Sequence, residues 1–122
     1  MNRRYVAMGA VLALLAVAAG AFGSHALAAR IPAERLGTFE TAARYQMYHA
    51  LALLLVGLAF DRLPPGRARL SGRLFVAGTL VFCGSLYALA LGAPRWFGAV
   101  APVGGLCFMG GWLALAAAAF RS

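Results

Sequence analysis

Two histidines are the side chains of this sequence whose ordinary pKa lies closest to neutral pH. His25 falls in GAFGSHAL at residues 20–27, and His49 ends YQMYH at residues 45–49. Imidazoles on neighbouring helices can bind a metal ion or haem iron. They can equally form hydrogen bonds that hold helices in register. The sequence therefore predicts a contact between His25 and His49 and leaves its role open.

A wider set of polar side chains is expected to gather around the two imidazoles, near one face of a membrane. The set is His25, Tyr45, Gln46, Tyr48, His49, Ser85 and Tyr87, with Glu40, Arg44 and Arg95 at its rim. It could hold helices together, ligate a metal or haem through the histidines, or bind a lipid headgroup or small solute beside Arg44 or Arg95. We favour the first interpretation, because polar contacts between membrane helices are usually structural.

Catalysis has little support in the sequence. Ser24 beside His25 is not a triad, because neighbours on a helix point in different directions. Cys83 and Cys107 lie inside apolar blocks without metal-ligand spacing, so they are expected to be small buried hydrophobes that could meet. We therefore expect a non-enzymatic protein with no cofactor.

The composition indicates a membrane protein. Of 122 residues 63% are hydrophobic and 11% charged, whereas soluble domains carry about 25% charged residues. The net charge is +8, and the arginines flank apolar blocks. This arrangement favours contact with a bilayer, including anionic lipid, over nucleic acid.

The chain is predicted to be all-α: a single membrane domain, residues 1–122, forming a bundle of four transmembrane helices. The expected spans are about 5–27, 42–60, 74–91 and 100–120. Residues 29–41 are expected to form an amphipathic helix at the surface, which turns or runs straight into span two. Residues 1–28 also resemble a secretory signal, but their apolar run is long and further spans follow, so we expect this helix to be retained.

Small residues form stripes along three of the predicted helices, which allow backbones to approach closely. They are Gly9, Ala13, Ala16, Gly20 and Gly23 in the first, Gly84 and Ala88 in the third, and Gly104 and Gly111 in the fourth. Such faces could also join the chain to a second copy or to a larger membrane complex. The function that we favour is accordingly a scaffold or accessory subunit.

Charge predicts the orientation of the bundle. With four spans, one side holds Arg3, Arg4, Arg62, Arg67, Arg69, Arg73 and Arg121, and the other holds Arg30, Arg35, Arg44 and Arg95. Cytoplasmic loops carry the excess of arginine. Both termini are therefore expected in the cytoplasm.

The two histidine motifs also resemble a known family. GAFGSHAL at residues 20–27 and FETAARYQMYHAL at 39–51 are similar to segments of the YgdD-like family of small, uncharacterised membrane proteins. GSLY at 84–87, PVGG at 102–105 and GGW at 110–112 extend the likeness along nearly the whole chain.

One departure from this family is Ser24, where its members more often have alanine. The resemblance implies a multi-pass protein of the bacterial inner membrane. It implies no activity, substrate or catalytic residue.

Overall fold

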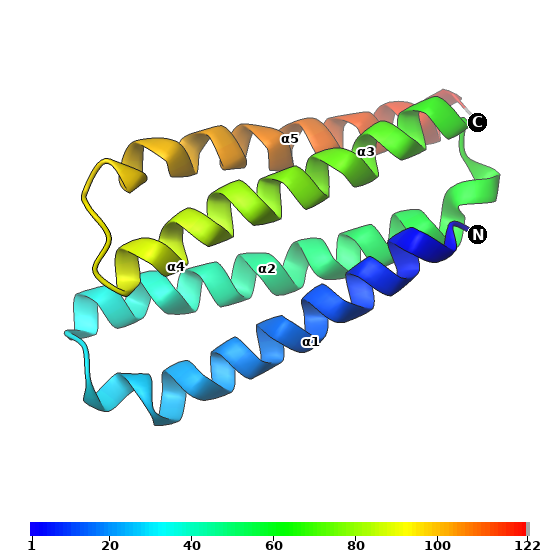
Figure 1. The fold of residues 1–122 in the computed structure, drawn as a ribbon. Coiled ribbons are helices and arrows are strands. Elements are labelled where there is room, and N and C mark those ends of the chain that lie inside the picture. The colour runs from blue at the N-terminus through cyan, green and yellow to red at the C-terminus, as the bar shows by residue number, and fades with distance from the viewer. Residues whose placement is uncertain (122) are drawn as a thin grey trace.

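The computed structural model describes residues 1–121, which fold into helices joined by short turns (Figure 1). The first hairpin consists of α1 (Arg3–His25), a 3-10 turn η1 (Leu27–Ala29) and α2 (Ala33–Ala59). A second 3-10 turn, η2 (Phe60–Arg62), leads to a long helical rod, a term that we use for a run of consecutive helical segments. That rod joins α3 (Pro65–Gly78), a π-helical segment η3 (Thr79–Cys83) and α4 (Gly84–Ala90), and it is followed by α5 (Phe97–Arg121). The prediction of an all-helical chain is confirmed.

Successive rods run antiparallel, and both chain ends lie at the same end of the molecule (Figure 1). The most extensive contacts are between α1 and α2 and between α3 and α5. The second helix, α2, also packs against α3 and α4, so it joins the two hairpins. By contrast, α1 packs mainly on α2 and diverges from the α3–α4 rod (Figure 1).

Among residues 1–121, three rods are long and apolar enough to cross a membrane: Arg3–Ala29, Pro65–Ala90 and Phe97–Arg121. The rod formed by α2 does not meet that criterion, and Arg44, Gln46 and His49 are among the polar residues of its central part. A bundle of four crossing helices is therefore a proposal, to which we return below.

Several helix boundaries differ from the predicted spans. Of the two alternatives for the segment before span two, the structure has the straight one: it is the beginning of α2, and its Phe39 is buried against Leu27 and Ala90. Likewise α3 begins at Pro65 rather than at residue 74, because proline suits the first helical position. The last helix begins at Phe97, so Pro102 lies in its second turn and not its first.

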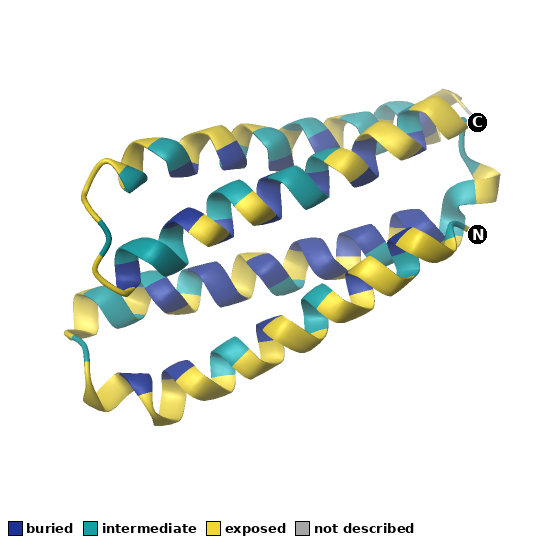
Figure 2. Cartoon of the chain, viewed as in Figure 1, coloured by how far each residue is buried: buried dark blue, intermediate teal, exposed yellow. Residues whose placement is uncertain are grey.

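The core follows α2, whose buried face is the most continuous of any helix (Figure 2). Near the chain ends, Leu53 and Val56 pack with Tyr5 and Phe75. Halfway along, Ala42 packs with Cys83 and Phe108. Helices α1 and α5 bury narrow stripes and expose large apolar side chains elsewhere, as expected for surfaces in lipid.

Many of the predicted small residues lie where two helices of this chain touch. A Cβ atom added at Gly9 would lie 2.8 Å from the Ala50 carbonyl oxygen, and one at Gly104 would lie 2.3 Å from the Phe82 amide nitrogen. Gly23 and Gly111 face the rings of Phe39 and Phe75 in the same way, and Ala16 is buried. Gly20 and Gly84 have no such neighbour within 4 Å, and Ala13 and Ala88 are half-buried.

Candidate functional site

The two histidines are far apart, which corrects the predicted contact between them. In the antiparallel pairing of α1 with α2, Gly23 packs on Phe39 and Gly9 on Ala50, so His25 is level with about residue 37. His49 lies some 12 residues further along α2, which is about 18 Å at 1.5 Å per residue. His25 is exposed, whereas His49 is buried, with 5% of its surface exposed. The prediction failed because α2 begins at Ala33, which places His49 past its midpoint instead of at its first turn.

The His49 ring has a defined chemical state. Trp112 of α5 donates from Nε1 to His49 Nε2 over 3.1 Å, and an indole N–H can only donate. The proton of the imidazole is therefore on Nδ1, which donates to the Tyr45 carbonyl oxygen over 2.8 Å. The ring also stacks on Phe108, with centroids 3.6 Å apart and planes 10° apart. This neutral imidazole fixes α2 against α5.

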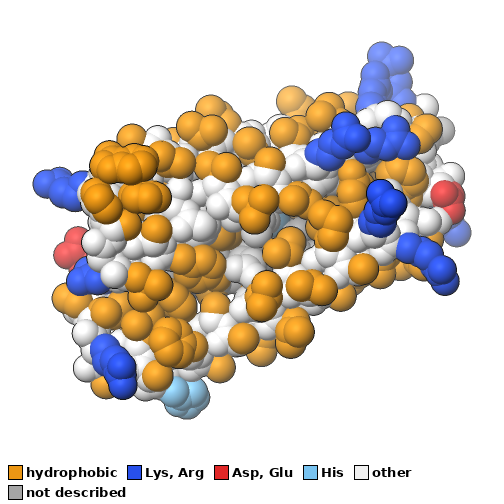
Figure 3. Space-filling model, in the orientation of Figure 1, with side chains coloured by type: hydrophobic (Ala, Val, Ile, Leu, Met, Phe, Trp, Pro, Cys, Tyr) orange, Lys and Arg blue, Asp and Glu red, His pale blue; other side chains and the backbone are white. Residues whose placement is uncertain are grey.

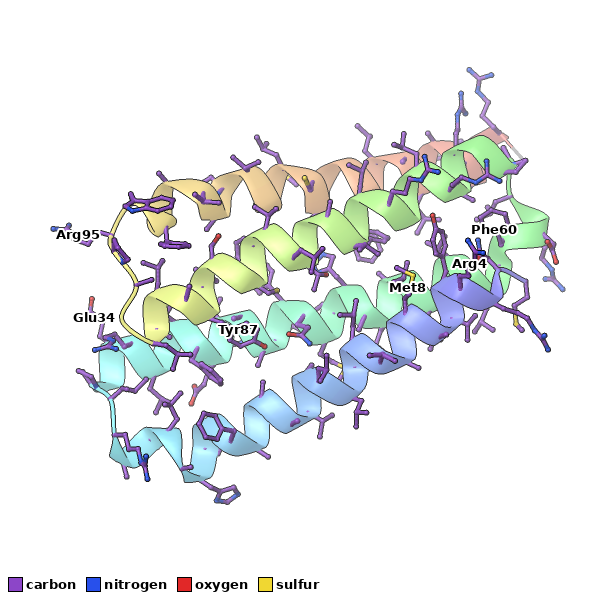
Figure 4. All side chains as sticks on the ribbon, in the orientation of Figure 1. Arg4, Met8, Glu34, Phe60, Tyr87 and Arg95 are labelled. Carbon is purple, nitrogen blue, oxygen red and sulfur yellow. The ribbon has the colours of Figure 1, made fainter. Side chains whose placement is uncertain are left out.

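A second polar contact joins three helices. Gln46 of α2 donates from Nε2 to the Leu12 carbonyl oxygen of α1 over 2.8 Å. Tyr87 of α4 donates its hydroxyl proton to Gln46 Oε1, also over 2.8 Å, and Figure 4 shows this side chain reaching from α4 toward α2. Gln46 is 6% exposed. Interhelical hydrogen bonds of this kind set the register of membrane helices.

The remaining members of the predicted polar set are spread over the molecule. Ser85 of α4 is buried and donates to the Val81 carbonyl oxygen in the preceding segment, η3. Tyr45 and Tyr48 are exposed neighbours on α2. Three more are exposed and take no part in the two interior contacts: Glu40, Arg44 and Arg95. Arg44 donates to Thr41 over 3.2 Å, and Arg95 lies in the turn before α5 (Figure 4).

The histidines do not form a metal or haem site in this structure. Both ring nitrogens of His49 are engaged by Tyr45 and Trp112, and His25 is too distant to share a ligand with it. Within residues 1–121, no group of three or more His, Cys, Asp or Glu side chains could hold a metal ion. Cys83 and Cys107 are free thiols.

Arg35 makes a structural contact that was not predicted from the sequence. Its Nε donates to the Ala90 carbonyl oxygen over 2.9 Å, so a cation lies at the carboxyl end of α4, where it stabilises the helix dipole. The chain then turns at Gly92, whose φ of 106° favours glycine. Helix C-termini attract arginine in general, but the sequence does not say which arginine reaches which helix.

Side chains of α1 line three pockets on the side of the molecule turned toward α3 and α4. We call this lining the α1 seam: Arg4, Ala7, Met8, Val11, Leu12, Leu15, Ala18, Ala19 and Phe22. An apolar pocket of about 290 Å³ also has Val76 of α3 in its lining. A second, of about 470 Å³, has Gln46 and Tyr87 in its lining. Both exist because α1 diverges from the rod beside it.

The third pocket lies where the seam meets the end of the molecule that holds both chain ends. It measures about 280 Å³ and is lined by Arg4 of α1 and by Arg69 and Arg73 of α3, together with Asn2, Tyr5 and Met8. The Tyr5 hydroxyl donates to the Arg69 carbonyl oxygen over 2.8 Å, which ties α1 to α3 at this point. Figure 3 shows arginines grouped at this end, hydrophobic side chains along the middle of the face, and further charged side chains at the opposite end.

The apolar helices, the arginines at their ends and the polar contacts between helices define a helical membrane protein. Residues 19–105 match the family described as "Protein of unknown function (DUF423)". The chain belongs to this family of uncharacterised membrane proteins, which confirms the predicted kind of family. The YgdD-like name stays a resemblance.

Named relatives have almost the same length as this chain. It is 40% identical over 118 residues to the UPF0382 membrane protein YwdK of Bacillus subtilis (strain 168), covering 96% of each chain. It is 38% identical over 122 residues to a UPF0382 membrane protein of Haemophilus influenzae, covering 100% of this chain and 98% of that one. No solved structure matches it.

Proposed function

We propose that all four rods cross the inner membrane of a bacterium, with both chain ends in the cytoplasm. Helix α2 has 27 residues and is about 40 Å long, enough for a hydrocarbon layer of about 30 Å. It packs along α1, a candidate span, and its polar Gln46 and His49 are buried and hydrogen-bonded. A crossing helix can carry such side chains because they never meet lipid.

The exposed Arg44 is compatible with this crossing. It lies 11 residues from the start of α2, and its side chain donates toward that end, to Thr41. Long arginine side chains reach from inside the hydrocarbon to the headgroups in this way. The excess of arginine at the opposite end supports the cytoplasmic placement of the chain ends.

Single cysteines in a background of Cys83→Ala and Cys107→Ala test this topology. We expect Ala29→Cys and Arg95→Cys to react with a membrane-impermeant maleimide in intact bacterial cells, and Gly66→Cys to react only after permeabilisation. All three native residues are exposed. Equal labelling of positions 29 and 66 would show that α2 does not cross, and the reverse pattern would invert the orientation.

We further propose that the protein acts without catalysis, as a lipid-binding protein of the membrane. The observation that carries this proposal is the α1 seam, whose two apolar pockets open along the side of α1 that the rest of the chain leaves uncovered. Pockets within the hydrocarbon layer suit an acyl chain, because their lining is apolar and a lipid can enter them laterally from the bilayer. Gln46 and Tyr87, which line the larger pocket, already bond to each other.

The predicted scaffold or accessory role gains less from the structure. It depended on small-residue faces that would meet another protein, but Gly9, Gly23, Gly104 and Gly111 face neighbouring helices of this chain. Association with a second copy or a larger complex therefore remains a prediction without a defined surface.

Filling the seam tests the lipid-binding proposal. We expect the protein, purified in mild detergent, to retain phospholipid, and the double variant Ala7→Phe, Ala18→Phe to lose most of it, because both side chains line the apolar pockets. The control is Ala10→Phe, Ala21→Phe, which places the same rings three residues further along the helix at exposed positions outside the pockets. Phosphorus per mole of protein measures the retained lipid.

Equal lipid in both variants and in the unaltered chain would contradict the proposal. A dimer that dissociates in the seam variant alone would assign the seam to a second copy of the chain instead.

A further inference from the structure

We infer that the arginine-lined end of the α1 seam binds the phosphate headgroup of an anionic phospholipid, with one acyl chain in the 290 Å³ pocket beside it. This inference rests on the proposed lipid-binding function and adds the chemistry of the ligand. Two observations carry it: a group of arginines without acidic partners, and an apolar pocket that continues from it.

The three arginines come from two helices and face one space. Arg69 and Arg73 lie one turn apart on the same face of α3, and Arg4 approaches from α1. Figure 4 shows Arg4 and Met8 on the side of α1 turned toward α3. The Tyr5 ring lies against Gly72, where an added Cβ would be 2.1 Å from a ring carbon, so the Tyr5 side chain bridges α1 and α3 here.

No carboxylate of residues 1–121 neutralises this group. Asp61 is the acid at this end, and it pairs with the amino group of Met1. The other two acids, Glu34 and Glu40, belong to the first turns of α2, at the opposite end. Three guanidinium groups around one pocket repel one another, and a bound anion relieves that repulsion. Guanidinium groups also match phosphate geometrically, because two N–H groups can donate to two oxygens at once.

The second observation, the adjacent apolar pocket, favours a lipid over a soluble anion as the ligand. Met8 lines both the arginine pocket and the apolar pocket, so the two are adjacent. From Arg4 to Leu12 the seam rises by about 12 Å, close to the roughly 15 Å depth of one leaflet's hydrocarbon. A phosphate among the arginines therefore has its acyl chains at the correct depth. Basic pockets between membrane helices bind anionic headgroups by this principle.

Competition between two lipids tests the inference. The full-length protein in detergent is mixed with equal amounts of phosphatidylglycerol and phosphatidylcholine of matched chains, and bound lipid is identified by native mass spectrometry. We expect at least a tenfold preference for phosphatidylglycerol. The triple variant Arg4→Gln, Arg69→Gln, Arg73→Gln should lose that preference, because a hydrogen bond between charged groups is worth about tenfold in affinity.

The control variant removes the same charge at the same end. In Arg3→Gln, Arg62→Gln, Arg121→Gln, three exposed arginines outside the pocket are replaced, and the preference should change less than threefold. A second variant, Val76→Trp, leaves the charge intact and fills the apolar pocket, so it should weaken binding of both lipids. Thermal unfolding shows whether each variant is folded.

The outcomes are distinct. Retained lipid with no preference for phosphatidylglycerol would overturn the headgroup assignment while the lipid-binding function stands. Loss of preference in the control triple as well would mean that net charge, not this pocket, selects the lipid. If inorganic phosphate displaces phosphatidylglycerol at equal concentration, the site is one for a soluble anion. If no lipid is retained by the unaltered protein, both proposals fail.

Discussion

Gly104→Ala is expected to destabilise the folded protein by about 2–3 kcal/mol, whereas Gly105→Ala is expected to be neutral or stabilising by up to about 1 kcal/mol. The new Cβ at position 104 would lie 2.3 Å from the Phe82 amide nitrogen and 2.7 Å from its Cα. Backbone atoms cannot move aside as a side-chain tip can, so α5 must separate from η3. At Gly105 the nearest atom, Phe82 Cδ2, is 4.0 Å away.

The adjacent glycine is a matched control, because both substitutions add one methyl group to the same helix and gain the same helix propensity. Unfolding in mixed micelles with a denaturing detergent, followed by tryptophan fluorescence, measures the difference. Equal stability of the two variants would mean that α5 and η3 do not approach as closely as this structure shows.

His49→Ala is expected to cost about 2–4 kcal/mol, whereas His25→Ala should change the free energy of unfolding by less than about 0.5 kcal/mol. Removal of the buried imidazole leaves a cavity beside Phe75 and Phe108 and leaves the Trp112 N–H without its partner. His25 is exposed at the end of α1 and has no hydrogen bond from its side chain.

The same unfolding measurement compares the two alanine variants. Trp112→Phe removes the hydrogen-bond donor while keeping an aromatic ring. It should therefore lower the free energy of unfolding by only part of the amount expected for His49→Ala. If both histidine variants were equally destabilised, the imidazoles would share a site after all, as their motifs in the sequence had suggested.

Several elements of the fold were predictable because they depend on local composition. The apolar blocks at residues 5–27, 74–91 and 100–120 each fall, to within one residue, inside the limits of a long apolar helix of the structure. The ends of two helices also have local causes, because proline fixes its own φ at the start of α3 and Gly92 can adopt a positive φ after α4. Ala16, Gly23, Gly104 and Gly111 stood out because small residues recur at helical spacing.

The candidate site was harder to predict, because it depends on depth and on which helices are neighbours. With span two expected to begin near residue 42, His49 falls in its first turns and close to the membrane boundary. In the folded chain, Gln46 and His49 face the interior and are hydrogen-bonded there. A sequence shows that a residue is polar, but not whether another helix supplies its partner.

The sequence by itself determined the class of the protein, its helices and the unequal distribution of its arginines, because composition and length depend on the chain alone. Tertiary structure decided that Trp112, not His25, bonds to His49, and that Arg4, Arg69 and Arg73 share one pocket. These pairings arise from the angle and register at which α1 meets α2 and diverges from α3. That geometry is set by close contacts such as Gly9 on Ala50, between residues 41 positions apart in the chain.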